Sequence, residues 1–439
     1  MEEENKLKKY SIHIGLFILT LFTTTLAGKD WMGLTDISWW DGFFKGMEYS
    51  IPFLGILTIH EFGHYITARK YGAKVSLPYF IPFYFPFINT FGTFGAFIRI
   101  LSAHKSRTEV FDIGIAGPLA GFIAAMMLLF YGFTHLPEPE YIYKVHKQYQ
   151  EFGLDYPKHV YNYEFAVKEH HEAFKTDSLN FEKQQDEDSL KFVTEQRAKG
   201  NNNSVIFNKK KYEGGRRFEA YPVYSTLTVG KNLIFLFFEK LIADDPALVP
   251  NKYELFHYPF IFAGYLALFF TAFNLFPIGQ LDGGHIIYGL FGTKYHRIIS
   301  VSVFISFVYL AGVGIFRNNV FANAFASVSE LLIFAPLYIY LLYLIFSKIT
   351  DHQTTNLMIA VSVFAAQFFT EFILPEFKGF NGWFLFAFLI GRFLGVNHPE
   401  AYDESPISLK RKILGWIALI IFVLCFTPQL YDVELMVKQ

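Results

Sequence analysis

The pentapeptide HEFGH at residues 60–64 holds the side chains of this sequence best suited to chemistry. On a helix, residues four apart share a face, so His60 and His64 can offer two imidazoles to one metal ion. Glu61 projects beside them, where its carboxylate can activate a water molecule instead of binding the metal. The run 49–67 is almost wholly apolar up to this motif, and ionisable groups at such depth are costly and usually mark function. The alternative is a polar cluster at a helix end, lying at the level of the lipid headgroups.

A second polar group lies far along the chain, in the segment 274–285 with the sequence NLFPIGQLDGGH. Taken alone, Asp-Gly-Gly is more often a turn than a metal site. Here it ends another apolar segment, and its helix breakers free backbone groups. Catalytic zinc takes three protein ligands and leaves a fourth position for water, so Asp282 would complete a set with His60 and His64. Asn274 supplies an amide that could hold a substrate backbone or stabilise an oxyanion.

The composition narrows the class of protein and the kind of metal site. The chain is 52% hydrophobic and 20% aromatic, with 54 Phe and 18% charged residues, which is typical of a membrane protein. The net charge of -1 argues against a nucleic-acid partner, which would require a basic face. The one cysteine, Cys425, can form neither an intramolecular disulfide nor a thiolate zinc site. Any metal must therefore be held by histidine and carboxylate.

Apolar runs of about 17–25 residues predict the membrane spans that position these groups. We expect an α-helical polytopic membrane protein with about 8–9 transmembrane helices, of which the run interrupted by Arg392 is the weakest. The first run follows Lys6, Lys8 and Lys9; we expect it to be retained, although cleavage as a signal peptide stays open. The predicted spans are 11–28, 47–68, 110–134, 256–277, 298–316, 327–347, 355–374, 379–396 and 413–430.

The distribution of Lys and Arg in short loops predicts the orientation. Basic residues precede the spans at 11, 298 and 413 and follow the span 47–68, and all fall on one side if the N-terminus is cytoplasmic. The 60–64 motif then lies toward the cytoplasmic end of its span. The acidic start, without Arg or Ser enrichment, argues against an organelle transit peptide. We expect a multi-pass protein of a prokaryotic inner membrane.

Two segments are not predicted to span. Residues 76–100 are apolar but punctuated by proline and glycine, and their aromatic and β-branched content predicts an extended, membrane-associated β-ribbon whose edge could pair with a peptide. A re-entrant loop that merely packs is the alternative. Residues 136–224 form a polar insertion, small and α+β, with a helix over 163–199 and a hairpin over 204–224. A half-buried helix over 227–243 is expected to lie on the membrane surface.

These segments predict four parts of the chain. Residues 1–135 form an N-terminal membrane core with the 60–64 motif and the ribbon, and 136–255 form the extramembrane insertion with its interfacial helix. Residues 256–297 form the part of the membrane core that holds the third metal ligand. Residues 298–439 hold additional C-terminal transmembrane helices.

With both polar motifs in view, the chain resembles the site-2 protease family of intramembrane zinc metalloproteases, peptidase family M50. The matching pieces are H-E-x-x-H in one span, Asn-x-x-Pro followed by Leu-Asp-Gly in a later span, and Gly-Pro-Leu-Ala-Gly at 117–121 between them. The stretch 95–97 resembles the family's β-ribbon. The resemblance covers roughly 45–135 and 256–292. The two zinc motifs together are specific, whereas the glycine-rich pieces also serve ordinary helix packing.

The resemblance implies a metalloendopeptidase that cleaves transmembrane segments of single-span membrane proteins in or near the bilayer, as in regulated intramembrane proteolysis. Its other partners would be a zinc ion and the lipid bilayer. The chemistry agrees, because zinc brings the pKa of its water towards 7 and a nearby carboxylate can take the proton. A helical substrate must first unwind, because its carbonyls are engaged in hydrogen bonds. The residues carried over are the zinc ligands His60, His64 and Asp282, the general base Glu61, and the substrate-binding residues Asn274 and Pro277.

The chain also departs from the family pattern. Several members carry a PDZ domain between the corresponding spans, and 136–224 contains no Gly-Leu-Gly-Phe-type loop, so recognition of peptide ends there is doubtful. The same residues suggest two alternative functions. A metal transporter would need further carboxylates or histidines in neighbouring spans, and there are few. A catalytically silent relative would usually lack Glu61 or a ligand, and here all are present.

Overall fold

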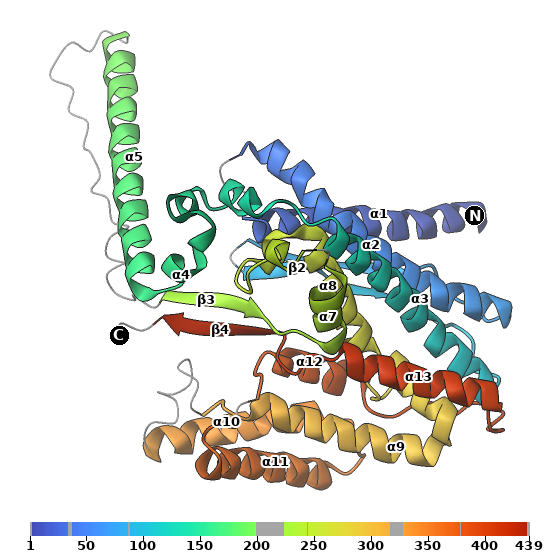
Figure 1. Cartoon of the computed structure of the whole chain (residues 1–439). Helices are drawn as coiled ribbons and strands as arrows, with labels where there is room; N and C mark the ends of the chain where they lie inside the picture. Colours follow the sequence, from blue (N-terminus) through green and yellow to red (C-terminus); the bar gives the residue numbers. More distant parts are fainter. Residues whose placement is uncertain are drawn as a thin grey trace. The chain divides into compact units, whose positions relative to one another are not determined.

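The computed structural model describes residues 2–33, 37–86, 88–198, 224–243, 245–316, 328–377 and 379–436. They form two compact units. The first contains residues 1–138 and 229–430, and the second contains residues 139–228 and 431–439. Figure 1 labels the α-helices of both units and the strands β2, β3 and β4.

Helices build the first unit, and α3 is central to it. The α3 helix packs against α2, α8 and α9, while α1 packs against α2 and the ribbon. The helices α1, α2 and α3 can be followed one after another in Figure 1. The helices of the unit are α1 (Glu2–Trp31), α2 (Trp39–Lys70), α3 (Arg107–Thr134), α7 (Leu233–Phe237), α8 (Pro259–Asn274), α9 (Asp282–Gly312), α10 (Val328–Phe346), α11 (Gln353–Ile373), α12 (Trp383–Leu389) and α13 (Leu409–Cys425).

The α2 helix begins and ends where its sequence allows. Ser38 accepts a hydrogen bond from the backbone N–H of Asp41 and so caps the first turn. Arg69 and Lys70 in the last turn complement the negative end of the helix dipole. Gly46 lets α1 approach closely, because a Cβ at this position would lie 2.3 Å from the carbonyl oxygen of Thr25. The helix that carries both histidines is thus capped at its start and held against α1.

A two-stranded antiparallel ribbon occupies the segment where the sequence predicted one. Strand β1 (Tyr79–Phe85) pairs with β2 (Ile88–Phe97), and the register shifts twice along the pair. Helix α1 binds one strand through side chains, because Thr23 Oγ1 donates to the Gly92 carbonyl at 2.7 Å and Trp31 Nε1 donates to the Thr90 carbonyl at 2.8 Å. The α1 helix therefore anchors the ribbon as well as α2.

Four helices in the described residues are long and apolar enough to cross a membrane: Tyr10–Trp31 within α1, together with α3, α9 and α11. The predicted count of eight or nine is not established. Of the other predicted spans, 256–277, 327–347 and 379–396 fall on the shorter apolar helices Pro259–Asn274, Ile333–Phe346 and Trp383–Leu394. The span 413–430 falls on α13, which has 17 residues and carries three basic ones, 410–412, in its first turn. The span 47–68 falls on α2, whose polar residues lower its hydropathy.

Buried amides and hydroxyls join the C-terminal helices of the first unit. Gln367 on α11 donates through Nε2 to the Val308 carbonyl of α9 at 3.1 Å, and Tyr338 on α10 donates to Gln367 Oε1 at 2.9 Å. The glutamine side chain is fully buried, so these bonds satisfy groups that could find no water. They fix α9, α10 and α11 to one another.

The second unit contains two 3₁₀ turns (Pro139–Lys144 and Lys147–Asp155), α4 (Pro157–Val160), α5 (Tyr163–Ala198), β3 (Tyr224–Val229) and β4 (Tyr431–Met436). Its small core consists of Ile142, Tyr149, Tyr156 and Val160. The helix predicted over 163–199 is observed as α5. The predicted hairpin over 204–224 lies outside the described residues, except for its last position.

The predicted surface helix over 227–243 was wrong at its start. Residues 227–229 belong to β3, which pairs with β4 from the other end of the chain. Thr228 and Val229 favour a strand because branched side chains suit a pleated surface, and the pairing partner is too distant in sequence to be foreseen. The rest of the range contains α7 and a π-helical turn, Phe238–Ile242.

Candidate metal centre

Three ligand atoms from two helices lie close together, two on buried histidines and one on a partly buried aspartate. On α2, His60 and His64 lie one turn apart, with their Nε2 atoms 3.1 Å from each other. Asp282, the first residue of α9, places its Oδ2 atom 3.2 Å from each Nε2. His60 and His64 are 4% and 6% exposed, so bulk water has little access to either ring. The described residues thus bring both halves of the predicted ligand set together.

This triangle fits a zinc ion. Zinc bonds of about 2.0–2.2 Å at tetrahedral angles separate neighbouring ligand atoms by roughly 3.3 Å. The three separations here are 3.1, 3.2 and 3.2 Å. Two imidazoles and one carboxylate are also a donor set that catalytic zinc sites use, with one position left open.

Helix α3 orients the second histidine. His64 Nδ1–H donates to the backbone carbonyl of Ile113 at 2.7 Å. Because Nδ1 carries the hydrogen, the Nε2 lone pair is free to face the metal position. The bond also prevents the ring from turning.

Glycines of α3 allow this close approach. A Cβ at Gly117 would lie 2.1 Å from His64 Nε2, and one at Gly121 would lie 3.1 Å from His60 Nδ1. On α2, a Cβ at Gly63 would lie 2.6 Å from the Ala116 carbonyl oxygen. In the sequence, Gly117 and Gly121 matched a family motif, and ordinary helix packing was the alternative. The structure shows that these two glycines pack against the histidine pair itself.

The turn before α9 places the carboxylate. Gly279 has φ 53°, which favours glycine, and its N–H donates to Ser300 Oγ at 2.7 Å. A Cβ at Gly283 would lie 2.0 Å from the Leu275 carbonyl oxygen, and one at Gly284 would lie 2.2 Å from the Gly279 carbonyl oxygen. The two glycines after Asp282 therefore let the start of α9 lie directly against the preceding loop. The positive end of the helix dipole favours a carboxylate at this first position.

The remaining predicted residues lie as follows. Asn274, the last residue of α8, has its Nδ2 atom 3.2 Å from His60 Nε2, at the edge of the ligand group. Glu61 is 5% exposed, and the backbone N–H of Ile98, just after β2, lies against its carboxylate. Pro277 lies in the loop between α8 and α9 and restricts the backbone there. Pro277 therefore differs from the other five predicted residues: it shapes the loop and does not lie beside the ligand atoms.

A second group of histidines, which the sequence did not reveal, lies behind the third ligand. His285, one turn after Asp282, is 2.7 Å from His398 across their Nδ1 and Nε2 atoms. The His398 ring stacks on Tyr288 at 4.1 Å, and its Nδ1–H donates to the Pro399 carbonyl at 2.6 Å. Burial, together with the neighbouring His285, lowers the pKa of His398 to about 2, so this ring stays neutral. No sequence pattern links His398 to the 274–285 segment, because 113 residues separate the pair.

The part of the chain that contains this centre is similar to known proteins. The model of peptidase family M50 matches residues 48–316. "Probable zinc metalloprotease EGY2, chloroplastic" of Oryza sativa subsp. indica is 31% identical over 123 residues, which is 27% of this chain and 22% of that protein. "Probable zinc metalloprotease EGY1, chloroplastic" of Arabidopsis thaliana is 38% identical over 87 residues, or 20% of this chain and 15% of that protein. The matches thus span less than a quarter of either relative. No solved structure matches the chain.

Proposed function

Since the chain belongs to peptidase family M50, we propose that it is a zinc-dependent metalloendopeptidase that cleaves transmembrane segments of other membrane proteins. The observation that carries this proposal is the triangle of His60, His64 and Asp282, with sides of 3.1–3.2 Å, beside the carboxylate of Glu61. When bound there, zinc supplies a Lewis acid that polarises a carbonyl and brings the pKa of water towards 7. The names of the relatives, which call them zinc metalloproteases, agree with this assignment.

Glu61 is the general base in this proposal. Its carboxylate takes a proton from the attacking water and later gives it to the nitrogen of the leaving amine. Burial beside His60 and His64 keeps bulk water from competing for that proton. Asn274 Nδ2 lies close enough to the ligand group to donate to a substrate carbonyl, where negative charge develops during attack.

The ribbon is proposed to hold the substrate in an extended form. A transmembrane helix cannot be attacked until it unwinds, because each carbonyl accepts a backbone hydrogen bond. In the described residues the ribbon has two strands, so strand edges are left for an added strand. Ile98, the residue after β2, lies against Glu61, so a strand paired along the ribbon would lead toward the base. Pro277 would help to shape the loop next to this path.

The membrane location is part of the proposal. Four helices long and apolar enough to cross a bilayer support a multi-pass protein. We place the site toward the cytoplasmic face of a prokaryotic inner membrane, because Lys and Arg cluster in the loops on that side. The relatives are named chloroplastic, so a plastid membrane is the other compartment to be tested.

Cleavage of a single-span substrate in reconstituted vesicles tests the function. We expect Glu61→Gln to lower the rate by about 10²–10⁴-fold, the usual contribution of a general base, while one zinc per chain is retained. Asp282→Ala should lose both zinc and activity, since it removes a ligand. Glu48→Gln is the control, because Glu48 lies on the same helix, is partly exposed and pairs with Lys45. Full activity in Glu61→Gln would show that Glu61 is not the base, and full zinc content in Asp282→Ala would overturn the ligand set.

A further inference from the structure

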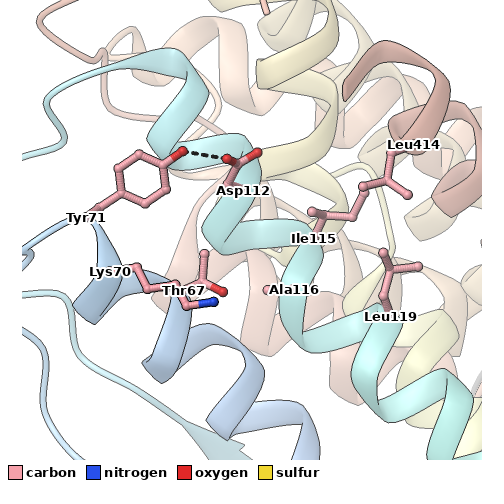
Figure 2. A pocket seen from close by; sticks show the side chains of 8 residues that line it. All are labelled: Thr67, Lys70, Tyr71, Asp112, Ile115, Ala116, Leu119 and Leu414. Carbon is pink, nitrogen blue, oxygen red and sulfur yellow. Dashed lines mark hydrogen bonds between the residues drawn. The ribbon is translucent and has the colours of Figure 1, made fainter. Parts of the chain in front are cut away.

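A groove beside the metal centre has no role in the proposed reaction. It has a volume of about 500 Å³ and lies between the end of α2, one face of α3 and the start of α13. Figure 2 shows the side chains that line it, with Lys70 and Tyr71 from α2, Asp112 and Leu119 from α3, and Leu414 from α13. Its position at the predicted cytoplasmic ends of α2 and α3 puts it near the level of the lipid headgroups.

The groove is polar at one end and apolar at the other. Tyr71 donates a hydrogen bond to Asp112 at the polar end. Figure 2 shows this pair apart from Leu119. From Asp112 to Leu119 the α3 helix rises by about 10 Å, and Ile115 and Leu414 line the groove over that stretch. Such a surface fits a molecule with a polar head and a hydrocarbon tail.

The charge at the polar end is positive. Arg411 donates to both carboxylate oxygens of Asp112, each at 2.7 Å, so the negative charge of Asp112 is balanced. Lys70 is exposed and has no carboxylate within ion-pair distance in the described part of the chain. Lys410 and Lys412 flank Arg411 at the start of α13. The net positive charge complements a phosphate and disfavours a cationic headgroup.

From these observations we propose that the groove binds an anionic phospholipid. Its phosphate lies at Lys70 and the basic start of α13, and one acyl chain lies along Ile115, Leu119 and Leu414. Basic pockets between transmembrane helices on the cytoplasmic side recognise acidic lipids in this way. The inference rests on the membrane location proposed above but not on the chemistry of the metal centre. A lipid held here joins α2, the helix of the zinc ligands, to α13.

Thermal unfolding of the delipidated full chain in detergent tests this site. We expect phosphatidylglycerol to raise the melting temperature in a saturable manner, and phosphatidylcholine with the same acyl chains to have a much smaller effect. Glycerol 3-phosphate should fail as well, because it lacks the acyl chain. Lys70→Gln should weaken the apparent affinity for phosphatidylglycerol about fivefold, the contribution of one basic residue at a membrane surface.

Two further variants separate a built site from general attraction. Lys74→Gln removes an equal charge on the same side of the membrane, outside the groove, and should leave the affinity unchanged. Leu414→Trp should fill the apolar end and abolish the stabilisation while zinc content stays at one per chain. Equal stabilisation by phosphatidylcholine or by glycerol 3-phosphate would overturn the proposal. Equal losses in Lys70→Gln and Lys74→Gln would also overturn it, since they would show attraction to the surface alone.

Discussion

Gly117→Ala tests whether α3 sets the position of the zinc ligands. A methyl group at this residue would lie 2.1 Å from Nε2, 2.4 Å from Cδ2 and 2.5 Å from Cε1 of His64. Ordinary contact between such atoms needs roughly 3.5 Å, so either the ring or α3 must move by about 1.4 Å to clear the shortest contact. The ring cannot turn aside without breaking the 2.7 Å bond from its Nδ1–H to the Ile113 carbonyl. Zinc distances tolerate only about 0.2 Å of error.

The size of the effect follows from this overlap. Overpacking of a well-packed interior typically costs about 1–3 kcal/mol. Bound zinc would hold His64 Nε2 in the position that overlaps the methyl group. Most of the overpacking energy therefore destabilises the zinc-bound form. At about 1.4 kcal/mol for each factor of ten, the affinity for zinc should fall by roughly 5–150-fold. Loss of the orienting bond would add a further decrease, since such bonds contribute about 10–100-fold to metal affinity.

Competition against a chromophoric chelator measures this affinity in the detergent-solubilised protein. Gly55→Ala is the matched control, because Gly55 lies on α2 and a Cβ there would have no atom within 4 Å. We expect wild-type zinc affinity in Gly55→Ala and a loss of both zinc and cleavage in Gly117→Ala. If Gly117→Ala binds zinc within threefold of wild type, the described contact between α3 and His64 does not position the ligand.

Two further predictions concern buried side chains that contact α9, namely His398 and Arg107. His398 has a pKa of about 2 in the folded chain and about 6.5 when unfolded, so protons bind the unfolded state and stability falls as the pH drops below about 6.5. The free energy of unfolding of zinc-free protein would be measured at several pH values from 7.5 to 5. His398→Gln should make its decrease with falling pH less steep, by up to about 1.4 kcal/mol per pH unit. An unchanged pH dependence would contradict the buried neutral ring. Arg107 is buried and donates through Nε to the Gly289 carbonyl at 2.9 Å, so Arg107→Met should lower the free energy of unfolding by about 1–3 kcal/mol. The exposed Arg69→Met should have little effect, and equal losses in the two variants would show that the buried bond contributes nothing.

Local patterns in the sequence predicted several elements well. The prolines, glycines and aromatic residues of 76–100 indicated an extended ribbon, and the structure has β1 and β2 there. The charged stretch 163–199 indicated a helix and forms α5. Each of these depends on residues that are close in sequence, where backbone preference decides the outcome. The prediction of helix at 227–229 was wrong, because these residues form β3 and its partner strand lies some 200 residues later.

Membrane spans were harder to predict from composition. Nine apolar runs suggested eight or nine spans; four helices in the described residues are long and apolar enough to cross a membrane, and the full count stays a prediction. An apolar run shows that a segment avoids water, which burial between neighbouring helices achieves as well as lipid does. The α8 helix is an example, because nearly all of its residues are buried inside the protein. Run length alone therefore cannot separate a span from a core helix.

The sequence by itself determined which groups of this protein could bind a metal. The spacing of His60 and His64 places them on one helix face whatever the rest of the chain does, because the period of a helix is a local property. The tertiary structure alone decided that Asp282 lies 3.2 Å from both imidazoles, that glycines of α3 leave room for His64, and that His398 packs behind the third ligand. These are contacts between residues far apart in the chain. They depend on how whole helices pack, which no local pattern of residues encodes.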